Sequence, residues 1–353
     1  MALLAVMGII LALLPLAAAV TIETRLDLLM QRNARSNAEA FYAAEAGLSH
    51  ARAELRPSAS LAGLLHGPDR TPGTADDGVF PFELAMPSDF TLTSSGYDVF
   101  AYAGPGGTVR LRSRGRGHND ALSEVEALLA TNPAPFTPGA LYVEASNADI
   151  DLGTRGYRVS GVAAHGGAGD VIAGIAISSS NAAEALHSSI APVDAIVGTG
   201  PPPSIVATSP LDIDSYADAL EQRPDGVLVS ASEGGPLTLG TPASPQLTLI
   251  SGAWTTTELV DGFGILLVRG DLEIRHHFEY RGLVIVDGNV ELASSGDLQI
   301  EGALWSLNGL TSRLRLTGTG SLRYGPQVLA TVDAAIPNAL LHVPIIVAWR
   351  EVS

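Results

Sequence analysis

The sequence predicts an α+β protein: a long N-terminal helix, a small antiparallel β-sheet and a C-terminal domain like a right-handed β-helix or solenoid. Residues 1–20 carry no charged side chain, and residues 21–55 contain one glycine and no proline. Short runs of alternating hydrophobicity follow, and apolar segments near the C-terminus repeat one another. The chain has 38 glycines, 22 prolines and only 16% charged residues, a composition that favours many short strands and turns.

The first 20 residues predict an apolar spike. At a rise of about 1.5 Å per residue, this stretch just spans a bilayer core of roughly 30 Å. The alternative is a cleavable signal peptide, with Ala17 and Ala19 as the small residues of its cleavage site. No lysine or arginine precedes the apolar run, which is longer than a usual signal core. We therefore expect one uncut helix through residue 55, about 80 Å long in all.

Beyond residue 20 the helix is predicted to be amphipathic. Apolar residues recur at steps of three, four and seven, which places them on one helix face. They are Met30, Ala34, Phe41, Ala44, Leu48, Ala51 and Leu55. Asn37 interrupts this seam and argues against a strict coiled coil. Pro57 ends the helix, because the residue before a proline is disfavoured in the α conformation. We expect Phe41 and Leu48 to be buried against neighbouring helices or the β-sheet.

Residues 33–48 of this helix read N-A-R-S-N-A-E-A-F-Y-A-A-E-A-G-L. Together with the apolar stretch before it, this run resembles the N-terminal region of PilX-type minor pilins of type IV pili. The resemblance covers about the first 55 residues. It implies a pilin-like helix that assembles into a filament. The candidate residues for assembly are Met1, Ala5, Met30, Ala34, Phe41, Glu45 and Leu48.

One position departs from the pattern of related major pilins, which carry a glutamate at the fifth mature position. That glutamate is thought to neutralise the terminal amine of the subunit ahead. Here the position holds Ala5, if Met1 is the mature start. A subunit without the glutamate has less need of a neighbour in front. The resemblance therefore implies a place at or near the filament tip.

The resemblance also implies partners and a location. The partners are other major and minor pilins, and the location is the bacterial inner membrane before assembly and the extracellular pilus or cell surface afterwards. No cofactor is expected, and a surface ligand of the β domain is a further candidate partner. A net charge of −17, from 20 basic and 37 acidic residues, argues against nucleic acid as a partner. The absence of cysteine excludes disulfides and thiolate metal sites.

Composition divides the chain into a helix at 1–56, a β head at 57–132 and a solenoid-like domain at 133–353. The second boundary lies within the proline-rich run T-N-P-A-P-F-T-P at 131–138. The connector after the helix contains three aspartates that could offer oxygens to calcium. These are Asp69, Asp76 and Asp77. Their spacing is not that of an EF-hand loop, so a solvated turn is the favoured interpretation.

The β head is predicted to contain a strand with four arginines on one face. Alternation along residues 108–116 separates these arginines from the apolar residues on the other face. They are Arg110, Arg112, Arg114 and Arg116. A phosphate-binding face is one interpretation. Ion pairs with Glu124 and Glu126 of a neighbouring strand are the favoured one.

The clearest internal repeat lies near the C-terminus. Residues 264–274 (G-I-L-L-V-R-G-D-L-E-I) are echoed by residues 282–292 (G-L-V-I-V-D-G-N-V-E-L), and a weaker copy begins at Gly302. Offsets of about 18 and 20 residues are typical of one rung of a β-solenoid. Glycine followed by aspartate or asparagine is expected at the corners, where a positive φ is needed.

Several motifs on these rungs suggest sites. The tripeptide at 269–271 is the arginine-glycine-aspartate read by integrins, but its place in the repeat indicates a turn. His276 and His277, beside several charged residues, suggest a carbohydrate-cleaving groove. Adjacent strand residues point to opposite faces, so the two histidines cannot serve one site. We therefore expect no catalytic residue and a non-enzymatic minor pilin. The alternatives are a membrane-tethered β-solenoid adhesin or carbohydrate-active surface protein, and a minor pseudopilin of a type II secretion system.

Overall fold

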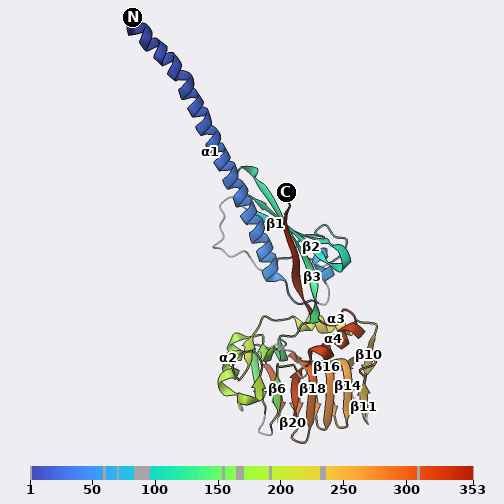
Figure 1. Ribbon diagram of the computed structural model, residues 1–353. Coiled ribbons are helices and arrows are strands. Elements are labelled where there is room, and N and C mark those ends of the chain that lie inside the picture. Colours follow the sequence, from blue (N-terminus) through green and yellow to red (C-terminus); the bar gives the residue numbers. More distant parts are fainter. Residues whose placement is uncertain are drawn as a thin grey trace. The chain divides into compact units, whose positions relative to one another are not determined.

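A computed structural model describes most of the chain (Figure 1). Residues 1, 59–60, 70, 83–95, 153–155, 164–170, 191–192, 231–235, 308–310 and 353 lie outside the description. For residues 2–18 and 311–312 only the backbone is described. The chain forms two compact units. Unit 1 is Met1–Arg56, Ser60–Thr131 and Pro344–Ser353, and unit 2 is Pro57–Ala59 and Asn132–Val343.

Unit 1 is a long helix packed on a four-stranded sheet. The helix α1 is continuous from Ala2 to Glu54, which confirms the predicted N-terminal helix. Strands β1, β2 and β3 pair antiparallel, and β21 from the chain's end lies beside β3. The bounds are η1 (Leu61–His66), β1 (Gly96–Ala103), η2 (Pro105–Gly107), β2 (Val109–Arg116), η3 (His118–Asp120), β3 (Leu122–Pro135) and β21 (His342–Val352).

The predicted membrane span is not seen in the described part of the chain. No helix there is both long and apolar enough to cross a bilayer. The predicted spike falls on residues 1–20, and the side chains of residues 1–18 lie outside the description. The span therefore stays a prediction from the sequence.

Unit 2 is a β-solenoid of about 4 turns, as the repeat predicts. Its strands stack in parallel into a 12-stranded sheet and a 5-stranded sheet, the latter in the order β13-β15-β17-β19-β5. The first part of the unit contains β4 (Gly139–Glu144), β5 (Asn147–Asp151), β6 (Arg158–Ser160), β7 (Ala173–Ile177), α2 (Ser180–Ser189), η4 (Val193–Ala195), β8 (Ile196–Val197), β9 (Ile205–Ala207) and α3 (Ile213–Glu221). The second part contains β10 (Gly226–Val229), β11 (Leu237–Leu239), β12 (Gln246–Ser251), β13 (Trp254–Thr256), β14 (Val260–Arg269), β15 (Leu272–Ile274), β16 (His277–Asp287), β17 (Val290–Leu292), β18 (Asp297–Leu307), β19 (Thr311–Leu316), β20 (Thr319–Tyr324) and α4 (Pro326–Ala335). The predicted right-handed coil stays a prediction.

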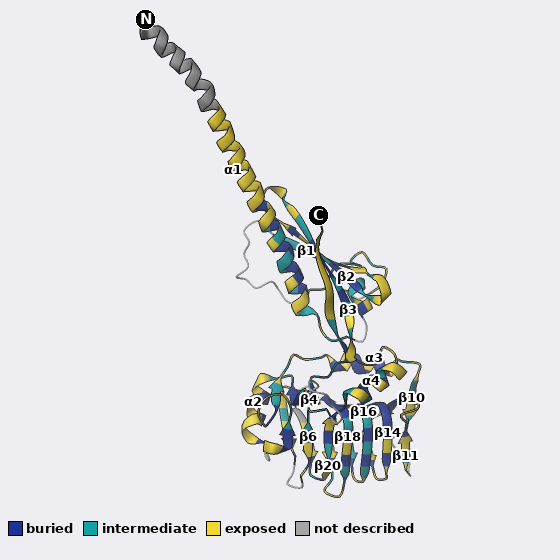
Figure 2. Cartoon of the chain, in the orientation of Figure 1, coloured by how far each residue is buried: buried dark blue, intermediate teal, exposed yellow. Residues whose placement is uncertain are grey.

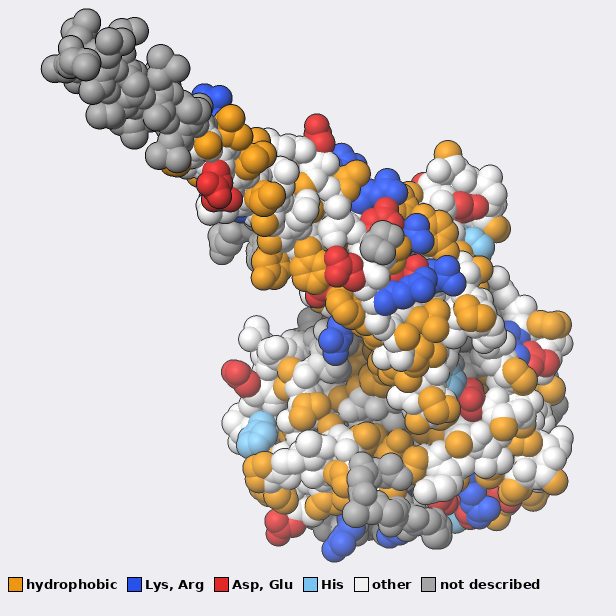
Figure 3. Space-filling model, turned by 45° about the horizontal axis from the view of Figure 1, so that its top comes forward, with side chains coloured by type: hydrophobic (Ala, Val, Ile, Leu, Met, Phe, Trp, Pro, Cys, Tyr) orange, Lys and Arg blue, Asp and Glu red, His pale blue; other side chains and the backbone are white. Residues whose placement is uncertain are grey.

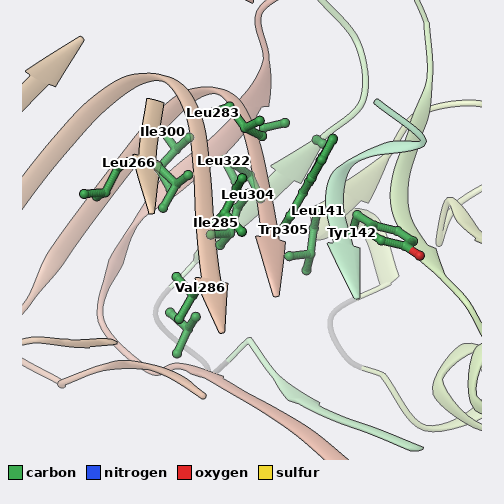
Figure 4. Packing of buried hydrophobic residues seen from close by; sticks show 14 of the residues in the cluster. Leu141, Tyr142, Leu266, Leu283, Ile285, Val286, Ile300, Leu304, Trp305 and Leu322 are labelled. Carbon is green, nitrogen blue, oxygen red and sulfur yellow. The ribbon is translucent and has the colours of Figure 1, made fainter. Parts of the chain in front are cut away.

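The repeat read from the sequence is also the pairing register of the strands. Gly264 of β14 pairs with Gly282 of β16, which pairs with Gly302 of β18. Side chains of successive rungs, among them Leu266 and Leu304, stack in the interior (Figure 4). Strands β14, β16 and β18 are apolar on both faces after these glycines. One face lines the solenoid interior, and α4 packs on the other. The sequence analysis did not foresee this helical cover.

The predicted corner chemistry needs a correction. Gly270 has a φ of +159°, but Gly288 is not among the described glycines with a positive φ. Large positive φ values instead occur at the glycines that begin each repeat, from +136° to +143° at Gly264, Gly282 and Gly302. A Cβ on Gly282 would lie 1.9 Å from the carbonyl oxygen of Gly264. The stacked glycines therefore allow close approach of the rungs at a bend within the long strands.

The last ten residues belong to unit 1, whereas the sequence assigned 133–353 as a whole to the solenoid-like domain. Strand β21 leaves unit 2 near His342 and joins the antiparallel sheet of unit 1. Pairing between residues more than two hundred positions apart leaves no local signal in the sequence, which is why this strand was misplaced.

Candidate interaction surface

The described side chains of α1 that precede Ser36 are exposed on all sides within unit 1. Residues 19–35 are all exposed, and burial begins at Ser36 (Figure 2). Six large apolar side chains in this stretch are each more than half exposed. They are Val20, Ile22, Leu26, Leu28, Leu29 and Met30. A contiguous apolar surface of this kind usually marks an interaction with another protein or with lipid.

Three of these side chains form a seam with charged flanks. Ile22, Leu26 and Leu29 follow at steps of four and three, which places them on one face of the helix. Arg25 flanks this seam on one side, and Glu23 flanks it on the other. Such a pattern fits a parallel or staggered helix from another chain, because the seam gives apolar contact and the flanks give charge pairing.

The C-terminal half of α1 packs on the sheet of its own unit. Ala44, Leu48 and Ala51 are buried in a cluster with residues of β1, β2 and β3. Small residues on α1 and on β2 allow the two backbones to approach closely. A Cβ on Gly115 of β2 would lie 2.0 Å from the carbonyl oxygen of Ala40. The run that resembles minor pilins therefore builds the helix–sheet contact inside unit 1.

Each predicted assembly residue on α1 has a definite environment where it is described. Met30 and Ala34 are exposed, Leu48 is buried, and Phe41 packs at the edge of the cluster. Glu45 is half-buried, and its Oε1 atom has no hydrogen-bond partner among the described residues. The two remaining candidates at positions 1 and 5 lie outside the described side chains.

Sequence reasoning missed the role of Gly47, the glycine of that run. A Cβ at this position would lie 2.4 Å from Ser113 Oγ and 2.7 Å from the ring of Tyr97. The signal was present, since Gly47 is the one glycine between residues 21 and 55. A glycine inside a helix costs stability, so it indicates a close approach by another element.

A polar contact fixes α1 against the turn after β2. Glu39 accepts a hydrogen bond from His118 (Oε2 to Nδ1, 2.6 Å) and forms an ion pair with Arg35 (Oε1 to Nε, 3.0 Å). The hydrogen bond to His118, followed by that to Arg35, lowers the pKa of Glu39 below its ordinary value. Both partners are exposed, so the contact orients the turn and adds little stability.

Three of the four arginines of β2 pair with Glu124 and Glu126, as expected, whereas Arg116 pairs with Asp98 of β1. Arg114 Nε lies 2.7 Å from Glu124 Oε1, and Arg110 Nε lies 3.2 Å from Glu126 Oε1. From β21, Arg350 reaches the same Glu126 at 3.0 Å. Basic and acidic side chains are mixed over this unit (Figure 3). Each of the four arginines is paired with a carboxylate, which supports the structural interpretation of this strand.

The three loop aspartates accept hydrogen bonds within their own loop. Asp69 Oδ1 accepts from the Thr71 amide (2.8 Å), and Asp77 Oδ2 accepts from the Gly73 amide (2.7 Å). Hydrogen bonds from Thr74 and from the Asp69 amide lower the pKa of Asp76. The described residues include no group of three acidic, histidine or cysteine side chains arranged to hold a metal. Calcium binding here stays an untested expectation.

In unit 2 the arginine-glycine-aspartate tripeptide is a structural turn. Asp271 Oδ1 accepts from the Asn289 amide of the next rung (2.7 Å), as the repeat predicts. Arg269 is more than a turn residue, however. It pairs with Asp218 and Glu221 of α3 and with Asp287 of the next rung. Its side chain, only 18% exposed, therefore ties the helix to the solenoid.

The two histidines occupy different environments. His277 Nδ1 lies 2.8 Å from Asp297 Oδ2, while His276 is exposed. Beside them, the outer faces of β16, β18 and β20 form a hollow of about 300 Å³. Its polar lining is Glu279, Arg281, Gln299, Glu301, Ser321 and Arg323. These side chains stand in two rows in the strand register, so the hollow offers both donors and acceptors to a polar ligand.

The fold and these surfaces define a modular protein, with a helix-on-sheet unit that exposes an apolar helix and a β-solenoid unit. No family model and no curated protein matches the chain. Among solved structures, the chain is similar to a competence-associated pilin, ComZ from Thermus thermophilus, at 11% identity. The alignment covers 90% of this chain and 98% of that chain, with a TM-score of 0.26. A score this low carries no argument about fold or function.

Proposed function

We propose that this chain is a non-enzymatic minor pilin that integrates into or primes a type IV pilus-like filament. The supporting observation is the exposed apolar seam of α1. A helix with Ile22, Leu26 and Leu29 facing solvent is unfavourable until another apolar surface covers them. In a filament whose core is a bundle of helices, neighbouring subunits supply that surface. Before assembly, residues 1–20 would rest in the inner membrane.

Charge substitution on the exposed seam tests this proposal. Leu26→Lys places an ammonium group in the predicted helix–helix contact, where an unpaired charge costs several kcal/mol. Incorporation into sheared, purified filaments should fall about tenfold or more. Gln31→Lys is the matched control, because Gln31 is an exposed polar residue on the side of the helix away from the seam. Equal recovery of both variants in filaments would contradict the proposal.

A position at or near the filament tip is the finer part of the proposal. It rests on Ala5 in the sequence and on the size of unit 2, which a helical shaft has little room to repeat. Gold label on unit 2 should mark one end of each filament. Label spread evenly along the shaft would contradict the tip position without affecting the pilin proposal. A minor pseudopilin of a type II secretion system would use the same helix.

A second candidate function is a surface adhesin or carbohydrate-active protein. The polar hollow on β16, β18 and β20 favours it, because planar carboxylate, amide and guanidinium groups suit the hydroxyls of a sugar. Deleting residues 1–35, which precede the part of α1 that packs on the sheet, distinguishes the two candidates. Loss of filaments supports the minor pilin, and loss of adherence with normal filaments supports the adhesin.

A further inference from the structure

The two edges of the sheet in unit 1 differ in their cover. The outer edge of β1 is paired with a short segment of the connector. Phe80 donates its amide to the Val99 carbonyl (3.0 Å), and Ala101 donates its amide to the Gly78 carbonyl (2.7 Å). Strand β21 forms the other edge of the sheet, with β3 on its inner side. On its outer side, the described residues pair with β21 only at its start, where His342 bridges Ser58. Among the described residues, the backbone groups along this edge of β21 beyond His342 have no pairing partner.

The uncovered strand is also apolar. From Ile345 to Trp349 it reads I-I-V-A-W, and all five residues are exposed, Val347 and Trp349 to 52% and 50%. Native proteins usually protect such an edge with charges, prolines or a covering segment. Here the central five residues carry none of these. Side chains on both faces of the strand would be buried by one further strand at this edge.

We propose that β21 is a docking edge for an extended segment of another protein, which adds a fifth strand to the sheet. Strand addition satisfies the open backbone groups, and alternate apolar side chains of the segment cover Val347 and Trp349. This inference is independent of the filament role of α1.

Charge indicates what kind of segment fits. Glu351 follows the apolar run and lines a hollow of about 410 Å³ with Glu124, and it has no ion-pair partner among the described residues. Glu124 is already paired with Arg112 and Arg114. A lysine or arginine at the end of the added strand would pair with Glu351. A second copy is disfavoured because each chain carries a net charge of −17.

The chain contains its own reporter for this docking. Of its three tryptophans, Trp254 and Trp305 are buried (2% and 1% exposed), and Trp349 lies on the proposed edge. Quenching of tryptophan fluorescence by acrylamide in the full chain therefore reports chiefly on Trp349. The probe is a short synthetic peptide of alternating valine and threonine with lysine at both ends. A peptide with glutamate ends and one with a central proline are the controls.

The lysine-ended peptide should lower acrylamide quenching at least twofold and shift the emission to shorter wavelength. The proline peptide should have no effect, and the glutamate-ended peptide should bind more weakly. Val347→Lys should abolish the protection, while Leu228→Lys, at an exposed leucine of unit 2, should leave it intact. Equal protection by the proline peptide, or in Val347→Lys, would overturn the proposal. So would concentration-dependent protection without peptide, which would identify a second copy as the occupant.

Discussion

Close packing is achieved in both units through glycine, but with different partners and different backbone conformations. In unit 1, Gly115 lets a strand approach the backbone of a helix, and its own conformation is ordinary. In unit 2, Gly282 lets one rung approach the next, and it has a φ of +136° that other residues rarely adopt. Gly282 is therefore required both by a close neighbour and by a positive φ, whereas Gly115 is required by a close neighbour alone. Substitutions should separate these constraints.

The largest effect is expected from Gly282→Ala. The new Cβ would lie 1.9 Å from the Gly264 carbonyl oxygen, and the positive φ adds strain, so unit 2 should lose about 3 kcal/mol or more. Gly252→Ala is the control, since Gly252 also has a positive φ (+89°) but has no atom within 4 Å of its Cβ position. It should cost about 1 kcal/mol. Similar melting temperatures for the two variants would show that rung contact is unimportant.

A smaller effect, confined to unit 1, is expected from Gly115→Ala. Its Cβ would meet the backbone of α1 at Ala40 and Ala44, and the helix must shift, at a cost of about 1–3 kcal/mol. Gly96→Ala, on β1 with no atom of the described residues within 4 Å of its Cβ position, should be neutral or slightly stabilising. Hydrogen exchange resolved by peptide should show faster exchange in β1 and β2 only. Faster exchange in the solenoid strands as well would mean that the two units do not unfold separately.

The comparison also shows what the sequence could predict. The solenoid repeat was readable because stacking places equivalent residues 18 to 20 positions apart, and each rung shows the same glycine and apolar run. The cross-strand pairs of Arg114 and Glu124 were readable because a hairpin brings nearby residues together. The sequence could not predict the pairing of β21 or the contacts of Arg269 with α3, because both join residues far apart in the chain. No periodic pattern marks such contacts.

The smallest of these effects, and the one that most departs from the sequence prediction, concerns Arg269. The repeat alone predicts that Arg269→Ala should scarcely change the melting temperature. The structure instead places its guanidinium among Asp218, Glu221 and Asp287, with a side chain 18% exposed. Removing it leaves three carboxylates without their shared cation.

We therefore expect Arg269→Ala to cost about 0.5–2 kcal/mol, less than the range for fully buried hydrogen bonds to charged groups, because the three carboxylates are 36–63% exposed and solvent screens them. Arg275→Ala is the matched control, because Arg275 pairs with one neighbour, Glu273, and is 56% exposed. An exposed pair of this kind contributes at most about 1 kcal/mol. Ile285→Ala, at a fully buried rung position, sets the upper reference at about 2–5 kcal/mol. Thermal unfolding should rank the losses as Ile285, Arg269 and Arg275. An Arg269 variant as stable as the Arg275 variant would mean that α3 is held to the solenoid by apolar packing alone.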